Sequence, residues 1–112
     1  METQQNPDGV PLVRATLKVL AGKWNIRVLW HLGNGPKRYN ELRQLMPGIS
    51  EKVLIQTLRE LEENEVVERV EVSETPLRIE YRFSDYGQTL VPVFRAMCNW
   101  GERHIEKMRQ KE

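Results

Sequence analysis

The sequence predicts a single α+β domain that is mostly helical, and three observations lead to this fold class. Apolar residues recur at helical spacing through most of the chain, and turn residues separate the segments. Between residues 66 and 83 the period changes to alternation, which is typical of strands. The length of 112 residues suits one domain and is too short to add a separate sensor domain.

The domain begins with two helices. A short helix is expected over residues 12–20, and the Ala-Gly pair that follows ends it. Residues 23–32 read KWNIRVLWHL and are apolar around most of the helix circumference, so we expect a central, buried helix. We place the domain at residues 11–108, between flexible tails at residues 1–10 and 109–112.

Two further helices, joined by a tight turn, form the most informative segment. Leu42 and Leu45 are expected to face inward from the first helix, at residues 40–46. A Pro-Gly-Ile turn follows, and Ser50 can accept a hydrogen bond from a free amide of the second helix. Three leucines of the second helix recur at i, i+4 and i+7 on one apolar stripe: Leu54, Leu58 and Leu61.

A hairpin follows the helix pair. Residues 66–72 and 78–83 alternate between apolar and polar side chains, and the turn cluster at residues 73–77 lies between them. A helix-turn-helix followed directly by a hairpin is a winged helix-turn-helix. Ser84 is expected to cap a long last helix that ends near residue 108, with Pro92 bending or splitting it.

The second helix of the turn motif carries polar side chains opposite its leucines. Lys52, Gln56 and Arg59 point outward and Ile55 lies beside them, at a helical step of roughly 100° per residue. Lys and Arg reach guanine acceptors, Gln pairs with adenine, and an apolar side chain can pack on a thymine methyl group. This pattern predicts a helix that binds the major groove of double-stranded DNA.

Other residues are expected to contact the DNA backbone, where phosphate contacts position a domain without reading its sequence. Ser50 lies at a helix N-terminus, which attracts phosphates. Arg78 lies near the hairpin tip and can reach a phosphate or the minor groove, unless the hairpin is only a surface feature. The remaining candidates flank the first helix of the motif: Arg38, Tyr39, Asn40 and Arg43. For Tyr39, a half-buried core position is an equal alternative.

The net charge of +1 is low for a nucleic-acid binder, so the distribution of charge matters more. Residues 37–59 hold five basic residues and two glutamates, whereas residues 60–74 hold seven glutamates and one arginine. The alternative is two ordinary solvated helix faces. The acidic segment would also suit a winged-helix domain that binds a basic protein, although apolar anchors would then be expected on the outward helix face. Double-stranded RNA is disfavoured because its major groove does not admit a helix.

The last helix carries an apolar stripe after the core elements of a small domain are already supplied. It packs on its own domain or pairs with a second copy, and we expect a homodimer. Two copies would read half-sites about 34–36 Å apart. The expected dimer contacts are Leu12, Leu90, Phe94, Met97, Trp100, His104 and Met108.

Several functional classes are disfavoured. No run approaches the ~20 apolar residues of a membrane span, and the N-terminus lacks the apolar core of a signal peptide. A single cysteine, Cys98, excludes an internal disulfide and fits a reducing cytoplasm. His31 and His104 have no partners at metal-ligand spacing, and no phosphate loop, nucleophile motif or zinc pattern is present. We therefore expect no enzymatic activity, cofactor or metal.

From about residue 12 to residue 104 the chain resembles the HxlR-type winged helix-turn-helix regulators, which are relatives of the MarR type. The segments that carry the resemblance are LKVLAGKW (17–24), GPKRYNELRQLMPGISEKVLIQTLRELEENEVVERV (35–70), TPLRIEYRFSDYG (75–87) and MCNWGERH (97–104). The resemblance implies a bacterial or archaeal transcription factor that binds operator DNA as a homodimer. In that family the first and last helices form the dimer contact.

One residue departs from the family pattern. Family members commonly carry a cysteine near the position of Pro11, and some use it to sense oxidants or aldehydes. Redox sensing is therefore disfavoured here, and Cys98 is expected to be a buried thiol. A small-molecule effector, if the protein binds one, is expected between the dimer helices and the buried second helix. Four aromatic residues are candidates for lining that cavity or for plain core: Trp24, Trp30, Phe94 and Trp100.

Overall fold

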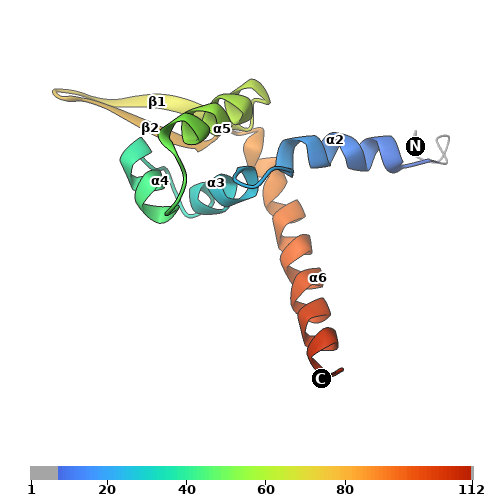
Figure 1. Ribbon diagram of the computed structural model, residues 1–112. Coiled ribbons are helices and arrows are strands. Elements are labelled where there is room, and N and C mark those ends of the chain that lie inside the picture. Colours follow the sequence, from blue (N-terminus) through green and yellow to red (C-terminus); the bar gives the residue numbers. More distant parts are fainter. Residues whose placement is uncertain (1–7, 112) are drawn as a thin grey trace.

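The computed structural model describes residues 8–111, apart from the side chains of Ser73 and Glu74, and is drawn in Figure 1. Five α-helices, a short 3-10 helix and two strands occupy this part of the chain. In order they are α2 (Val10–Leu20), α3 (Asn25–Leu32), α4 (Tyr39–Leu45), α5 (Glu51–Glu63), β1 (Val67–Glu74), β2 (Leu77–Phe83), η1 (Gly87–Leu90) and α6 (Val91–Arg109). Most of the predicted N-terminal tail and the last residue of the C-terminal one lie outside the described residues.

The core lies where α3, α4 and α5 meet the base of the hairpin. The predicted leucine stripe of α5 is confirmed, because Leu54, Leu58 and Leu61 are at most 2% exposed. The other buried apolar residues come from the end of α2, from α3, from α4 and the turn after it, and from the base of the hairpin: Leu20, Val28, Leu29, Leu32, Leu42, Met46, Ile49, Val66, Val67 and Phe83. This small core holds α5 in a fixed orientation.

Two predictions about inward-facing residues are wrong. Leu45 is exposed, and Met46 takes the buried position beside Leu42. The reason is that α4 ends at Leu45, so Met46, with φ −127° and ψ 73°, leaves the helical phase and turns its side chain inward. In α3, which was expected to be a central, buried helix that is apolar around most of its circumference, Trp30 is 55% exposed and Ile26 is also exposed.

The hairpin forms a two-stranded antiparallel sheet that projects from the body (Figure 1). Val67 pairs with Phe83 at its base, and Glu74 pairs with Leu77 at its tip, so the turn is shorter than predicted. A bulge between Glu71 and Ser73 shifts the register. Lys37 and Tyr81 exchange backbone hydrogen bonds of 3.0 and 2.8 Å, which join the loop before α4 to the base of the hairpin.

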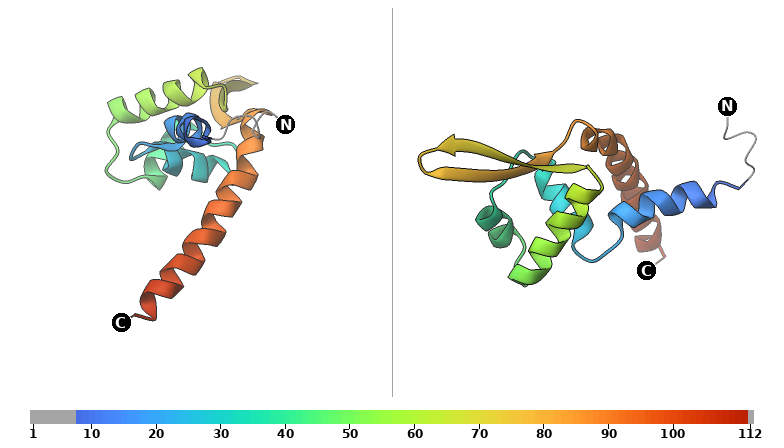
Figure 2. Two further views of the ribbon diagram at one scale, coloured as in Figure 1. Left: turned by 90° about the vertical axis from the view of Figure 1, so that its right-hand side faces the viewer. Right: turned by 90° about the horizontal axis from the view of Figure 1, so that it is seen from above.

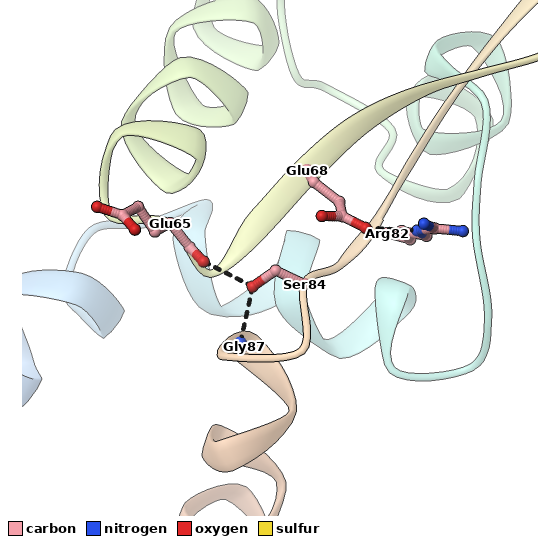
Figure 3. A network of polar contacts seen from close by, with 5 residues as sticks. All are labelled: Glu65, Glu68, Arg82, Ser84 and Gly87. Carbon is pink, nitrogen blue, oxygen red and sulfur yellow. Dashed lines mark hydrogen bonds and ion pairs between the residues drawn. The ribbon is translucent and has the colours of Figure 1, made fainter.

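A polar network connects the hairpin to the last helix (Figure 3). The Ser84 hydroxyl donates to the Glu65 carbonyl oxygen at 2.6 Å and accepts from the Gly87 amide at 2.8 Å. Gly87 has no room for a side chain, because a Cβ would overlap the Val66 carbonyl oxygen. Ser84 therefore binds the first residue of η1 and does not cap α6, whose N-cap residue is Leu90. The predicted split lies between η1 and α6. Pro92 is in the first turn of α6, where its missing N–H costs no helical hydrogen bond.

The two terminal helices extend away from the body in different directions (Figures 1 and 2). The radius of gyration is 16.9 Å, whereas a compact chain of this length would have about 13 Å. No residue of α6 is buried, and Leu20 is the buried residue of α2. These helices contribute little to the core of their own chain.

Candidate nucleic-acid interface

The turn between α4 and α5 sets the position and direction in which α5 begins. Gly48 has a φ of +94°, a conformation that favours glycine, in the turn between the two helices. Ser50 then accepts a hydrogen bond from the Val53 amide at 3.1 Å, as predicted for a capping serine. The turn and cap together define where α5 begins.

The outward face of α5 carries the predicted polar set. Lys52, Gln56 and Arg59 are all exposed, and Ile55 is 36% exposed beside them. The Gln56 amide lies 3.5 Å from the Glu60 carboxylate, which holds it weakly. Because the opposite face of the helix is buried, the helix cannot rotate these side chains away from solvent. The donors that base recognition requires are therefore presented together.

Around α4, three predicted phosphate ligands are exposed: Arg38, Asn40 and Arg43. Glu41 accepts a hydrogen bond from the Arg38 amide at 2.7 Å, which fixes the start of α4. Tyr39 differs, because it is half-buried and packs against the core. Its hydroxyl is enclosed with no hydrogen-bond partner among the described residues. Burial, followed by the nearby Glu51 carboxylate, raises the pKa of Tyr39. In this position the hydroxyl is closed to a phosphate.

The wing places a further arginine far from the core. Arg78 is exposed and pairs with Ser73, next to the end of the hairpin. Nearer the base, Arg82 forms an ion pair of 2.7 Å with Glu68, so the charge of Arg82 is largely compensated (Figure 3). Arg78 has no carboxylate within ion-pair distance in the part of the chain described.

The predicted dimer residues form two groups. Leu90 and Phe94 are half-buried and pack on the core of their own chain. The others are exposed along the terminal helices: Leu12, Met97, Trp100, His104 and Met108. The Trp100 and His104 rings stack with their centroids 4.8 Å apart. The sequence reasoning missed the exposed apolar face of α2, which the spacing of Val10, Val13 and Leu17 indicates.

The four aromatic residues that were candidates for an effector cavity or for plain core do not line a single cavity in this chain. Trp30 and Phe94 line a cavity of about 150 Å³. Its other apolar lining residues include Leu29, Phe83 and Val91. Trp24 borders a different groove beside α5, and Trp100 lies farther along α6. The prediction that Cys98 is buried is also wrong, because this thiol is exposed on α6.

Nothing in the described residues points to other chemistry. Residues 8–111 contain no group of three or more His, Cys, Asp or Glu side chains placed to hold a metal ion. Within the same residues, no helix combines the length and apolar composition that a membrane span requires. Burial, together with the charges of Arg27 and Lys37, lowers the pKa of His31.

A helix-turn-helix that presents Lys, Gln and Arg from its second helix, followed by a two-stranded wing, defines a winged helix-turn-helix DNA-binding protein. Residues 19–109 match the family described as HxlR-like helix-turn-helix, and the chain belongs to that family. The protein is therefore a transcriptional regulator with a helix-turn-helix DNA-binding domain, and it is not an enzyme.

Known proteins share both the sequence and the fold. The HTH-type transcriptional regulator YtcD of Bacillus subtilis is 44% identical over 96 residues, which cover 86% of this chain and 76% of that protein. The crystal structure of a MarR-family regulator from Enterococcus faecalis V583 has a TM-score of 0.85 at 32% identity, covering 92% of this chain and 94% of that one. The quinone-bound structure of YodB from B. subtilis has a TM-score of 0.72 at 34% identity, with coverage of 83% and 98%.

Proposed function

We propose that the protein is a homodimer that binds operator DNA sequence-specifically. In each protomer α5 enters the major groove, and the wing lies on the flanking backbone or minor groove. One observation carries this proposal: Lys52, Gln56 and Arg59 are exposed on a helix whose opposite face is fully buried. Such a helix presents hydrogen-bonding groups rigidly, as base recognition requires.

Each candidate residue has a specific role in this proposal. Arg59 and Lys52 reach guanine acceptors, Gln56 pairs with adenine, and Ile55 packs on a thymine methyl group. The phosphate ligands are the exposed residues around α4 and at the cap of α5: Arg38, Asn40, Arg43 and Ser50. Arg78 extends this contact from the wing. Tyr39 contributes by packing rather than by binding phosphate.

The terminal helices support the dimer. Beyond its first turn, α6 has little packing on its own chain, since none of its 19 residues is buried and Trp100 is 60% exposed. Pairing α6 and α2 of two protomers would cover Leu12, Met97, Trp100, His104 and Met108, and Leu90 and Phe94 would join this contact to the core. A two-fold dimer would then place two α5 helices on half-sites about 34–36 Å apart.

Two further features belong to the proposal. A small-molecule effector would bind at the cavity beside Trp30 and Phe94, where α3 meets α6, and the existence of a quinone-bound YodB supports a ligand-responsive regulator. The regulator acts in the cytoplasm of a prokaryotic cell, where its operator lies.

The test compares a base-reading residue with a phosphate-binding one on a selected operator and on random duplex. Arg59→Ala is expected to cost about 1–3 kcal/mol on the operator and to relax base preference at one position. Arg43→Ala is the matched control, and it should weaken binding to all sequences alike. Fluorescence anisotropy gives both affinities for each variant.

Equal losses on operator and random DNA for Arg59→Ala would show that α5 does not read bases. If no operator is selected at all, a winged-helix domain that binds a basic protein through the acidic end of α5 becomes the better explanation of the structure.

A further inference from the structure

The loop between α2 and α3 is held in one conformation. The Asn25 side chain is 9% exposed and donates from Nδ2 to the Val19 carbonyl oxygen across the loop at 3.1 Å. Gly22 allows the turn with a φ of +116°, and a side chain there would press on the Asn25 amide. The residues that follow Gly22 are therefore presented from a fixed backbone.

Two cations are gathered over one ring in this loop. Trp24 is half-buried against the core, with the Lys23 Nζ atom 5.2 Å and the Arg27 Cζ atom 4.9 Å from its ring centroid. Cation–π attraction limits the freedom of both side chains while leaving their charges in solvent. Neither cation has a carboxylate within ion-pair distance among residues 8–111, so both charges are available to a ligand.

One of the two cations, Lys23, lies beside α5. Lys23 and Trp24 line one groove together with Lys52 and Gln56 of α5. Both views in Figure 2 show the α2–α3 loop and the N-terminal end of α5 on the same side of the body. Glu60 also borders this groove, but it is one turn farther from the N-terminus of α5, beside the Gln56 amide.

We propose that Lys23 and Arg27, gathered over Trp24, form a second phosphate-binding element that holds the DNA backbone next to the groove occupied by α5. This inference rests on the proposed function. It adds a contact outside the helix-turn-helix and the wing, and it gives a role to the two uncompensated charges over Trp24, which shares a groove with Lys52. The element positions the duplex and does not read bases.

The test measures how binding to random-sequence duplex depends on salt, between roughly 50 and 300 mM. Lys23→Gln/Arg27→Gln removes both charges and is expected to reduce the slope of log K against log salt by roughly 1.8 per protomer. The matched control is Arg103→Gln/Lys107→Gln, an exposed pair with the same spacing and charge on the distal part of α6. The charge-conserving swap Lys23→Arg/Arg27→Lys should keep the wild-type slope. Thermal unfolding of each variant confirms that it is folded.

The outcomes separate this inference from the proposed function. If the wild type selects no operator but its binding to random duplex keeps its salt dependence, the proposed function is contradicted. The phosphate element is still supported in that case if Lys23→Gln/Arg27→Gln has a smaller salt slope than its control. If Lys23→Gln/Arg27→Gln has the same slope as its control, the phosphate element is refuted even when an operator is selected. A wild type that binds no duplex overturns both.

Discussion

The strongest prediction about assembly concerns Trp100. This side chain is 60% exposed in the single chain. A tryptophan exposes about 250 Å² in total, so about 150 Å² remains to be covered by a partner. At about 25 cal/mol per Å², burying that area contributes up to about 4 kcal/mol per protomer. Because alanine keeps part of this area and ordering the interface costs free energy, we expect Trp100→Ala to lose about 2 kcal/mol per protomer.

A two-fold interface contains the substitution twice, so the loss is about 4 kcal/mol per dimer. That corresponds to a rise of roughly a thousandfold in the dissociation constant. Sedimentation equilibrium over a wide concentration range measures this constant directly. Leu77→Ala is the control, since it removes a side chain that is 58% exposed at the wing tip, far from α6. An unchanged dissociation constant for Trp100→Ala, or a monomeric wild type, would refute the assignment of α6 to the dimer.

Three further predictions concern the body of the domain. Tyr39→Phe removes a hydroxyl that is enclosed without a partner, so the free energy of unfolding should rise by about 1 kcal/mol with no change in DNA affinity; weaker binding to every duplex would instead mean that the hydroxyl reaches a phosphate. The pKa of His31 is lowered in the folded chain, so as the pH falls through 6.5 the unfolded chain binds a proton at this site before the folded chain does. The free energy of unfolding therefore decreases on the acid side. Urea unfolding should therefore show a smaller acid loss of stability for His31→Gln than for the wild type, and identical losses would contradict the shift. Gly87→Ala forces a Cβ onto the Val66 carbonyl oxygen and should destabilise the domain by about 1–3 kcal/mol or more in thermal unfolding, whereas an unchanged melting temperature would place the start of η1 elsewhere.

The sequence predicts α5 and the wing well because both have strong local patterns. The leucine stripe, the capping Ser50 and the alternation in the hairpin each depend on neighbouring residues, and all of them are confirmed. Leu45 is mispredicted because α4 is only seven residues long, and one residue past its end the helical phase no longer applies.

Features that depend on tertiary placement could not be predicted from the sequence. The path of α6 away from the core exposes Cys98, which a helical pattern alone would bury. The four aromatic residues, candidates for an effector cavity or for plain core, do not line one cavity, because Trp24 faces α5 while Trp30 faces α6. The cluster of Lys23 and Arg27 over Trp24 was missed, although basic residues at i and i+4 beside an aromatic residue were a usable signal.

The most direct test of the central claim is selection from a random duplex library at about 150 mM salt, near physiological ionic strength. The wild type is compared with the triple variant Lys52→Ala/Gln56→Ala/Arg59→Ala. A dimeric regulator that reads DNA through α5 should enrich a two-fold symmetric motif with half-sites about 10 base pairs apart, and the triple variant should lose that enrichment. Absence of any enriched motif for the wild type, or the same motif recovered by the triple variant, would contradict the account.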